Sequence, residues 1–276
     1  MKTPKFRQTA AEKLRQDLAD LAAEATSSPL APRRRKQLDA QLRELMAELG
    51  RLLHELDPIR QPAAVFDPSN PKVVGRFISL ALVAQPRQLL KGVEAFYGSG
   101  VYAIYYNGSF PSYAPITRSE TPIYVGQAAP AMSNARTAME QGDRLARRLR
   151  DHRSNISKAT GTLNIDDFEY RALVVQSGWE SAAEDFLIHL FRPVWNSETN
   201  ILYGLGKHGD SAETRGNKRS PWDTLHPGRA WAAQTTEDAR TPTQITADLQ
   251  AHFESTKIYA NLDEVLHDFI DELRQV

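Results

Sequence analysis

The stretch Gly-Val-Tyr-Ala-Ile-Tyr-Tyr at residues 100–106, followed by Pro-Ile-Tyr-Val-Gly at 122–126, decides the fold of this chain. Both stretches are rich in β-branched and aromatic residues and are bounded by Gly or Pro, a composition typical of β-strands. If the two strands pair, Tyr102 and Tyr124 can point into one cleft. Either strand start alone is weak evidence, because such tripeptides arise by chance in many proteins. The residues that follow make the pattern specific.

Three polar groups follow the strands in a fixed order. Arg148 and His152 lie four residues apart in a cationic segment, so a helix places them on one face. Glu184 lies in an amphipathic helix predicted over 179–191, and Asn196 follows Phe-Arg-Pro-Val-Trp. The order is therefore strand, strand, basic helix, acidic residue on a helix, and asparagine.

This succession resembles the GIY-YIG nuclease superfamily, in which two Tyr residues, an Arg, a Glu and an Asn converge on one site. The resemblance implies an α+β fold, with a small mixed or antiparallel sheet flanked by helices. The connection between the strands, residues 107–121, is longer than is typical of the superfamily and puts strict hairpin geometry in doubt. That connection, the Arg-x-x-x-His spacing and the stretch 220–229 resemble the type II restriction endonuclease branch, over about residues 65–235.

The resemblance implies hydrolysis of phosphodiester bonds in double-stranded DNA, leaving 5′-phosphate and 3′-hydroxyl ends. Tyr102 corresponds to the tyrosine that activates the water, and Tyr124 positions the water or the phosphate. A free phenol has a pKa of about 10, so it needs help to act as a base near neutral pH. His152 can accept or share the phenolic proton, while Arg148 can grip the scissile phosphate.

The resemblance also implies a divalent metal ion. Glu184 is the acid among the proposed site residues, and a hard cation held by one carboxylate, phosphate oxygens and waters fits Mg²⁺, with Mn²⁺ as a substitute. Glu180 lies one turn earlier and is the fallback ligand. Asn196 matches the superfamily asparagine and can orient the water or the tyrosine.

The charge of the chain is unevenly distributed. The formal net charge is zero, but residues 144–158 contain six cations and one acid, whereas 231–276 contain nine acids and three cations. The local basic region could bind a nucleic acid, although the net charge of the whole chain is zero. The chain has no cysteine, which excludes disulfides, thiolate zinc sites and cysteine nucleophiles. No apolar run is long enough to cross a membrane, and no signal peptide is recognised, so a cytoplasmic protein is expected.

Cationic and amide side chains in the basic helix and in a loop-rich excursion, residues 198–231, are the DNA-binding candidates. They are Arg144, Arg147, Lys207, His208, Arg215, Asn217, Lys218, Arg219 and Arg229. Members of this branch cut the GC-rich palindrome CCGCGG, so the resemblance suggests that target. A palindrome is read most simply by a two-fold dimer, so a homodimer is expected. The competing interpretation of the excursion is a solvated loop without a DNA role.

The chain is expected to divide into three parts. Residues 1–60 form a helical hairpin, in which leucines alternate three and four apart between Leu38 and Leu56. Residues 61–235 form the nuclease core, and 236–276 form an acidic segment with a helix over about 260–274. The leucine seam packs either within the hairpin or on a partner subunit, and the sequence leaves both open.

Two other functions are compatible with the same fold. One is a GIY-YIG nuclease of DNA repair, recombination or homing, although such enzymes typically carry additional modules and none is evident. The other is a DNA-binding or assembly protein that retains the fold without cleaving. Discrete DNA fragments would indicate a restriction enzyme, irregular nicks a repair or homing nuclease, and binding without cleavage a non-catalytic protein.

Overall fold

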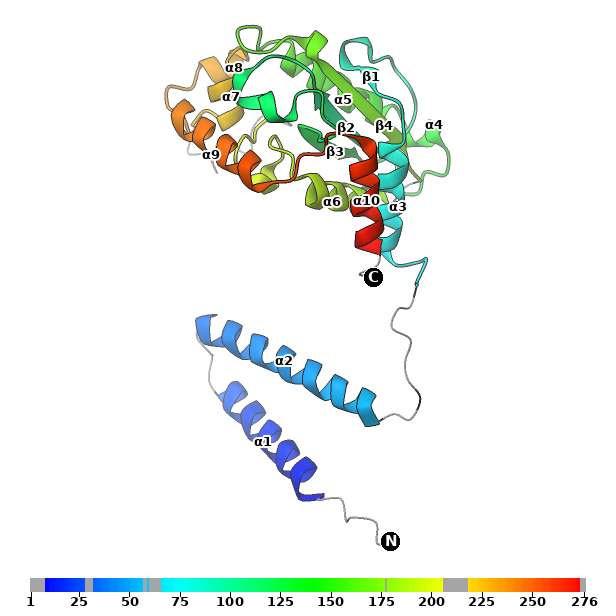
Figure 1. The fold of residues 1–276 in the computed structure, drawn as a ribbon, viewed down its shortest axis with the longest axis vertical. Coiled ribbons are helices and arrows are strands. Elements are labelled where there is room, and N and C mark those ends of the chain that lie inside the picture. The colour runs from blue at the N-terminus through cyan, green and yellow to red at the C-terminus, as the bar shows by residue number, and fades with distance from the viewer. Residues whose placement is uncertain are drawn as a thin grey trace. The chain divides into compact units, whose positions relative to one another are not determined.

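The structure is a computed structural model that describes residues 8–27, 32–56, 59, 66–176, 178–205 and 218–273. The chain divides into two compact units, residues 1–64 and 65–276 (Figure 1). Each unit has its own arrangement of elements. The first unit is helical, and the second contains the sheet and all the proposed catalytic residues.

The first unit consists of helices α1 (Gln8–Ser27) and α2 (Pro32–Leu56). They contact one another near their connection, where Arg34 and Glu24 form an ion pair at 3.1 Å. Further along α2 the leucine seam is open, with Leu52 51% and Leu56 64% exposed. The predicted N-terminal helices are therefore present, but the described part of the hairpin leaves the second half of the α2 seam uncovered.

The second unit is built on a four-stranded antiparallel sheet in the order β1-β4-β2-β3. Its strands are β1 (Gln88–Leu89), β4 (Phe168–Val174), β2 (Gly100–Tyr106) and β3 (Tyr124–Ala128). Strand β2 is central and fully buried, while β3 is an edge strand. The predicted α+β fold with an antiparallel sheet is confirmed.

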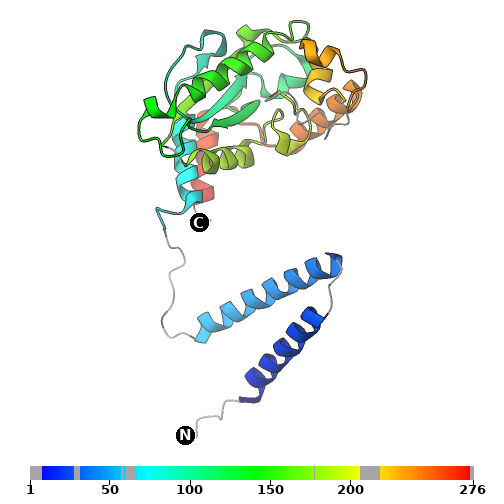
Figure 2. The same ribbon diagram turned by 180° about the vertical axis from the view of Figure 1, so that it is seen from behind.

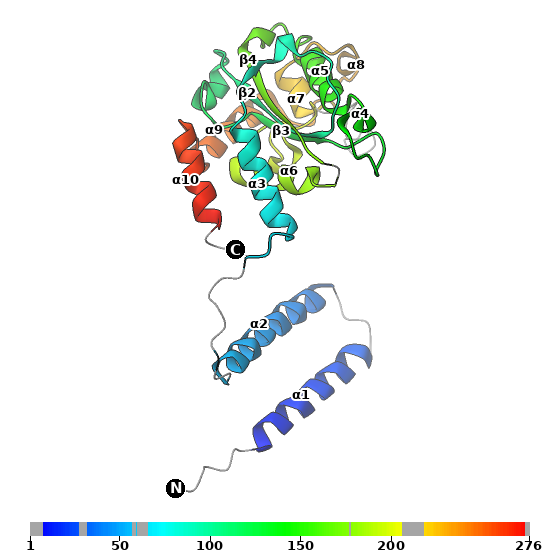
Figure 3. The same ribbon diagram turned by 90° about the vertical axis from the view of Figure 1, so that its right-hand side faces the viewer.

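Helices cover both faces of this sheet because side chains along a strand alternate between its faces. Tyr102, Ile104 and Tyr106 of β2 belong to a core with α5 (Arg144–Ile156) and α9 (Pro242–Ser255). The intervening residues of β2 belong to a second core, with α3 (Pro71–Val83), α6 (Glu180–Phe191) and α10 (Leu262–Leu273). Figures 2 and 3 show α5 on one side of the sheet and α3 with α6 on the other. The site residues on β2 and β3 therefore lie between the sheet and α5.

Short elements complete the unit. The helices are α4 (Ala138–Gln141), α7 (Pro221–Leu225) and α8 (Ala230–Ala233), and the 3₁₀ turns are η1 (Leu90–Gly92), η2 (Pro111–Ile116), η3 (Ile165–Asp167) and η4 (Ser197–Thr199).

The excursion 198–231 and the C-terminal segment are more integrated with the core than the sequence analysis expected. Leu202, Leu205 and Trp222 of the excursion are fully buried in the main core. Helix α9 was not predicted, and its Ile245 and Leu249 join the same core. Residues 65–276 therefore form one compact unit, without a separate segment after 235.

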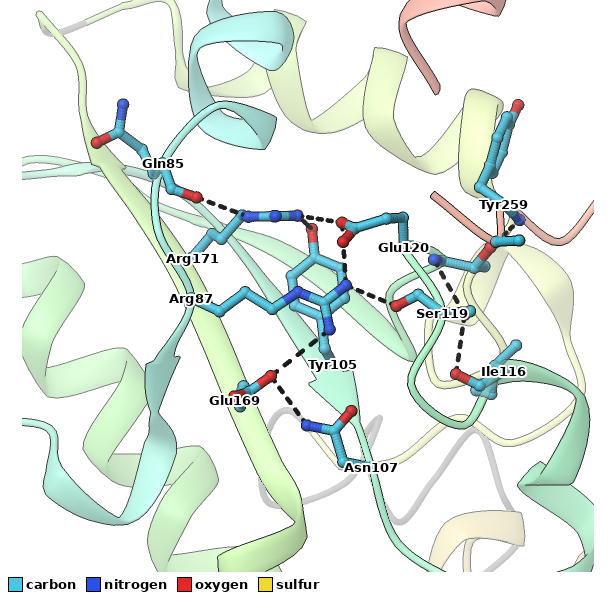
Figure 4. Close-up of polar contacts among 12 residues, drawn as sticks. Gln85, Arg87, Tyr105, Asn107, Ile116, Ser119, Glu120, Glu169, Arg171 and Tyr259 are labelled. Carbon is cyan, nitrogen blue, oxygen red and sulfur yellow. Dashed lines mark hydrogen bonds and ion pairs between the residues drawn. The ribbon is translucent and has the colours of Figure 1, made fainter. Parts of the chain in front are cut away.

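A buried polar cluster fixes the long connection between β2 and β3 (Figure 4). Glu120, near the end of the connection, accepts hydrogen bonds from Arg171 of β4 at 2.6 Å and pairs with Arg87 at 3.0 Å. Arg87 also donates to the Ser119 carbonyl at 2.6 Å and stacks on the ring of Tyr105 at 3.9 Å. The long connection therefore returns to the sheet, and β3 pairs with β2 in regular antiparallel register.

Candidate active site

The two tyrosines lie side by side on the α5 face of the sheet. Tyr102 pairs across the strands with Gly126, and Tyr124 pairs with Ile104. Their ring centroids are 6.0 Å apart, and both side chains are buried. The two strands thus bring the two phenols into one site, as the sequence pattern predicted.

Gly126 is required by this packing and not by its backbone angles. A Cβ atom at this position would lie 2.5 Å from the hydroxyl oxygen of Tyr102. Real Cβ atoms essentially never approach so closely, and Tyr102 is fully buried, so its ring has little room to move. The glycine of Tyr-Val-Gly therefore makes the space in which the Tyr102 hydroxyl lies.

Helix α5 supplies the imidazole and the guanidinium. Its Leu145 and Leu149 pack into the core, which turns His152 inward, only 1% exposed. The Tyr102 hydroxyl and His152 Nε2 are 2.6 Å apart, and the ring centroids of Tyr124 and His152 are 4.9 Å apart. Arg148, one turn earlier, hydrogen-bonds to both phenol oxygens.

Burial decides the protonation states of these groups. It raises the pKa of Tyr102 well above 10, an effect that nearby Tyr124 adds to and Arg148 opposes. Burial, together with the positive charge of Arg148, lowers the pKa of His152 to about 3. At neutral pH the pair is therefore a neutral phenol and a neutral imidazole, joined by a short hydrogen bond.

Glu184 reaches the same space from the other face of the sheet. Helix α6 packs along β3, and Glu184 lies near the backbone of Gln127 at the edge of the sheet, which lowers the pKa of its carboxyl. The carboxylate is near enough to Tyr124 and Arg148 to shift the pKa of the phenol and to be influenced by the guanidinium. Because β3 is an edge strand, a side chain on α6 can reach around it to the tyrosines.

The pKa of Glu184 is raised to about 7. Burial is the largest cause, followed by repulsion from Glu198 and Asp185, while Gln127 and Arg148 act in the opposite direction. Glu184 forms no ion pair within the part of the chain that the structure describes. A hard cation would relieve this uncompensated carboxylate, so the site fits a divalent ion. No group of three or more His, Cys, Asp or Glu suited to a metal occurs among the described residues.

Asn196 binds the backbone of β3 with both atoms of its side-chain amide. Its Oδ1 accepts from the Val125 N–H at 3.0 Å, and its Nδ2 donates to the Val125 carbonyl at 2.9 Å. These bonds satisfy the outer edge of β3, which no further strand covers. Asn196 therefore holds the strand that carries Tyr124.

Glu180, the fallback ligand, is bound within the protein. It is 4% exposed and accepts hydrogen bonds from Ser99 Oγ at 3.1 Å and from the Gly178 N–H at 2.8 Å. Ser99 and Gln141, which the sequence analysis did not single out, lie buried on the same side of the core. The Gly-Ser-Gly stretch at 98–100 was the available signal for Ser99.

The DNA-binding candidates fall into three groups. Arg144 and Arg147 lie on the exposed face of α5, and Lys218 is 45% exposed beside Glu237. Lys207, His208, Arg215 and Asn217 lie outside the described residues.

The remaining two candidates, Arg219 and Arg229, are bound within the fold. Arg219 donates to the carbonyls of Ala232 and Thr235 and pairs with Asp238. Arg229, only 2% exposed, forms two hydrogen bonds to Asp223. Both guanidinium groups have partners within the fold; Arg229 needs one because it is a buried charge, whereas the side chain of Arg219 is 26% exposed.

A comparison with protein families identifies the domain. Residues 94–253, more than half of the chain, match the family described as the Eco29kI GIY-YIG domain. The chain belongs to this family. It is a GIY-YIG restriction endonuclease family, so the match confirms the branch of the superfamily that the sequence suggested.

The family match covers the whole site. It begins at Glu94, before β2, and ends at Phe253 in α9, so all six predicted catalytic residues fall inside the Eco29kI GIY-YIG domain. Helices α3 and α10 pack against the sheet but lie outside the match. A search of curated proteins found no match. Within the described residues, no helix has the length and apolar character to cross a membrane.

Proposed function

We propose that this protein is a homodimeric, Mg²⁺-dependent type II restriction endonuclease. It hydrolyses double-stranded DNA at a GC-rich palindrome and leaves 5′-phosphate and 3′-hydroxyl ends. The observation that carries the proposal is the 2.6 Å hydrogen bond between Tyr102 and a neutral, buried His152, with Arg148 and Glu184 facing the same space.

The proposed proton path uses Tyr102 and His152 together. A water molecule attacks the phosphorus and the bond from phosphorus to the 3′ oxygen breaks. The water proton passes to the oxygen of Tyr102 while Tyr102 gives its own proton to His152 Nε2. Because burial raises the pKa of Tyr102 well above 10, a relay that never forms a free phenolate is favoured over a tyrosinate waiting for substrate. The neutral imidazole is the acceptor that this relay requires.

Arg148 and Glu184 are proposed to stabilise the negative charge of the reacting phosphate, Arg148 directly and Glu184 through a bound metal ion. The guanidinium of Arg148 can hold the scissile phosphate as a planar fork, and the approaching negative charge helps His152 to accept a proton. Glu184 would hold the Mg²⁺, with Mn²⁺ as a substitute. When bound, the ion supplies positive charge that stabilises the transition state and the departing 3′ oxygen.

Recognition is proposed from the same resemblance. Arg144, Arg147 and Lys218 are exposed and are proposed to contact DNA. The four candidates that lie outside the described residues, Lys207, His208, Arg215 and Asn217, are proposed for the same role. A homodimer places two sites on the two strands of a palindrome such as CCGCGG. The proposed location is the cytoplasm, where a restriction enzyme meets incoming DNA.

Digestion of a sequenced plasmid with and without Mg²⁺, followed by mapping of the ends, tests the proposal. We expect discrete fragments with ends at one palindrome, produced only with the metal. Tyr102→Phe should lower the cleavage rate by about 10²–10⁴-fold with little change in DNA affinity, because only proton transfer is lost. Irregular or structure-specific nicks would favour a nuclease of repair, recombination or homing. Tight binding without cleavage would favour a DNA-binding protein that retains the fold without catalysis.

A further inference from the structure

A buried polar cluster joins three of the four elements that carry the proposed catalytic groups: β2, α5 and α6. Its members are Ser99, which precedes β2, Gln141, which ends α4 just before α5, and Glu180, which begins α6. Their side chains are 0%, 4% and 4% exposed. The proposed mechanism uses none of them.

Ser99 is the centre of the cluster because each of its polar groups is bound to a different segment. Its N–H donates to Gln141 Oε1 at 2.9 Å, and its hydroxyl donates to Glu180 Oε1 at 3.1 Å. Its carbonyl accepts from the Val175 N–H at 2.9 Å, just after β4. Gln141 closes the arrangement by donating from Nε2 to the Val175 carbonyl at 2.9 Å.

Strand β2 and helices α5 and α6 begin at or close to this cluster. Tyr102 lies three residues after Ser99, and Glu184 lies one helical turn after Glu180. Helix α5, with Arg148 and His152, begins three residues after Gln141 and is held by two further bonds. Gly98 donates to the Gly142 carbonyl at 2.7 Å, and Leu145 donates to the Gly98 carbonyl at 3.0 Å.

We propose that Ser99, Gln141 and Glu180 form a positioning cluster, which sets where Glu184 lies relative to Tyr102 and His152. This inference rests on the proposed nuclease function. Glu180 acts as the attachment point of α6: one carboxylate oxygen takes the Ser99 hydroxyl and the other takes the Gly178 N–H. Both oxygens are used within the protein, so Glu180 supports the metal-binding carboxylate without being a ligand itself.

The physical reason is that α6 and the tyrosines lie on opposite faces of the sheet. Glu184 reaches the site around the edge strand β3, so a small rotation of α6 changes the distance from its carboxylate to the phenols. Contacts between packed side chains tolerate such rotation better than directional hydrogen bonds do. A misplacement of about 1 Å at a catalytic group can cost about 10²-fold in rate.

The test compares Ser99→Ala with a matched control, Ser220→Ala. Both serines are 0% exposed, and both hydroxyls donate to a buried carboxylate, that of Glu180 or that of Asp223. We expect similar losses of thermal stability in both variants. Only Ser99→Ala should lower the single-turnover cleavage rate, by about tenfold or more, and raise the Mg²⁺ concentration for half-maximal rate severalfold. Its affinity for DNA, measured with Ca²⁺ in place of Mg²⁺, should stay within about twofold.

Glu180→Gln and the double variant with Ser99→Ala decide between positioning and direct ligation. If Glu180 acts through Ser99, the double variant loses no more rate than the worse single variant. A direct metal ligand would instead raise the Mg²⁺ requirement in Glu180→Gln and leave it unchanged in Ser99→Ala. That outcome, or equal rate losses in Ser99→Ala and Ser220→Ala, overturns the proposal.

Hydrogen exchange gives a readout that does not depend on cleavage. Ser99→Ala should speed amide exchange in residues 178–184 and 98–102, and Ser220→Ala should not. If the wild type cuts no DNA, the nuclease proposal fails while this comparison still tests the cluster. Unchanged exchange at 178–184 in a folded Ser99→Ala protein overturns the cluster even where the wild type cleaves.

Discussion

At the scale of single residues, Glu184 shows how the site is prepared for a cation. Its pKa of about 7 lies well above the ordinary 4.5, because the carboxylate is partly buried near other acids. The folded protein therefore binds a proton here more tightly than the unfolded chain does. The contribution of this group to stability is full below about pH 4.5 and is lost as pH rises through about 7. The residue is costly to the fold in its ionised form, which is the form a metal needs.

Glu184→Gln should therefore stabilise the metal-free protein at pH 8 while abolishing cleavage. The amide keeps the shape and removes the charge, so the free energy of unfolding should rise by roughly 1–2 kcal/mol at pH 8, after allowance for solvent screening. At pH 4, where the wild-type carboxyl is mostly protonated in both the folded and the unfolded states, the gain should nearly vanish. Denaturant titrations at the two pH values measure both.

Mg²⁺ provides the control for this prediction. Added metal should raise the thermal midpoint of the wild type and leave that of Glu184→Gln unchanged, because only a carboxylate attracts the ion. A Glu184→Gln protein that cleaves at full rate would contradict the metal assignment.

At the scale of elements, strand β3 holds the site together although it lies at the edge of the sheet. It carries Tyr124, and through Gly126 it leaves room for the Tyr102 hydroxyl. Its free edge is bound by Asn196, and α6 packs along it to deliver Glu184. An edge strand suits this role because one side of its backbone is open to another element, here the Asn196 side chain.

Gly126→Ala should disturb chemistry more than binding. The added methyl meets a Tyr102 ring that cannot move away, so the ring or the strand must shift. We expect a loss of about 1–3 kcal/mol in stability and at least about tenfold in cleavage rate. Gly161→Ala is the control, because nothing lies within 4 Å of a Cβ at that position. A Gly126→Ala enzyme as fast as the control would show that the glycine is not needed for the Tyr102 geometry.

Helix α5 is expected to bind the DNA backbone with its outer face. Arg147 is 62% exposed and pairs with Asp143 one turn earlier, a pair that a phosphate can replace. Arg147→Ala should reduce the slope of log affinity against log salt by about 0.9 if the side chain neutralises one phosphate. Arg43 of α2 makes the same kind of pair with Asp39 and is the matched control, with no expected change. An unchanged slope in Arg147→Ala would remove this residue from the DNA interface.

At the scale of the whole molecule, the proposed dimer gives the helical hairpin a testable role. Leu52 and Leu56 continue the heptad seam of α2 and are more than half exposed. Apolar residues at heptad positions associate with other helices, so the seam is expected to contribute to the dimer.

Leu52→Glu combined with Leu56→Glu should convert a dimer into a monomer at about micromolar concentration, because charges cannot be buried in such a seam. Sedimentation equilibrium measures the change. Leu89→Glu, at another exposed leucine, is the control and should remain dimeric. A double variant that stays dimeric would place the two-fold contact elsewhere.

The sequence by itself determined the type of fold and most of the site. Periodicity and strand composition are local properties, so the paired strands, the basic helix and the amphipathic helix with Glu184 could all be read from 100–196. Tyr102, Tyr124, Arg148, His152 and Glu184 are brought together as predicted. The order of the motifs along the chain was enough for this prediction, because members of the family share one topology.

Only the tertiary structure decided how polar side chains are used. Asn196 binds the backbone of β3, 71 residues earlier in the chain, and Glu180 binds Ser99, 81 residues earlier, while Arg229 pairs with Asp223 within a buried turn of the excursion. A buried hydrogen bond or ion pair is specified by three-dimensional proximity and burial, and neither quantity is a property of a short stretch of sequence. For that reason the sequence identified the family, and the folded chain assigned each buried polar group its partner.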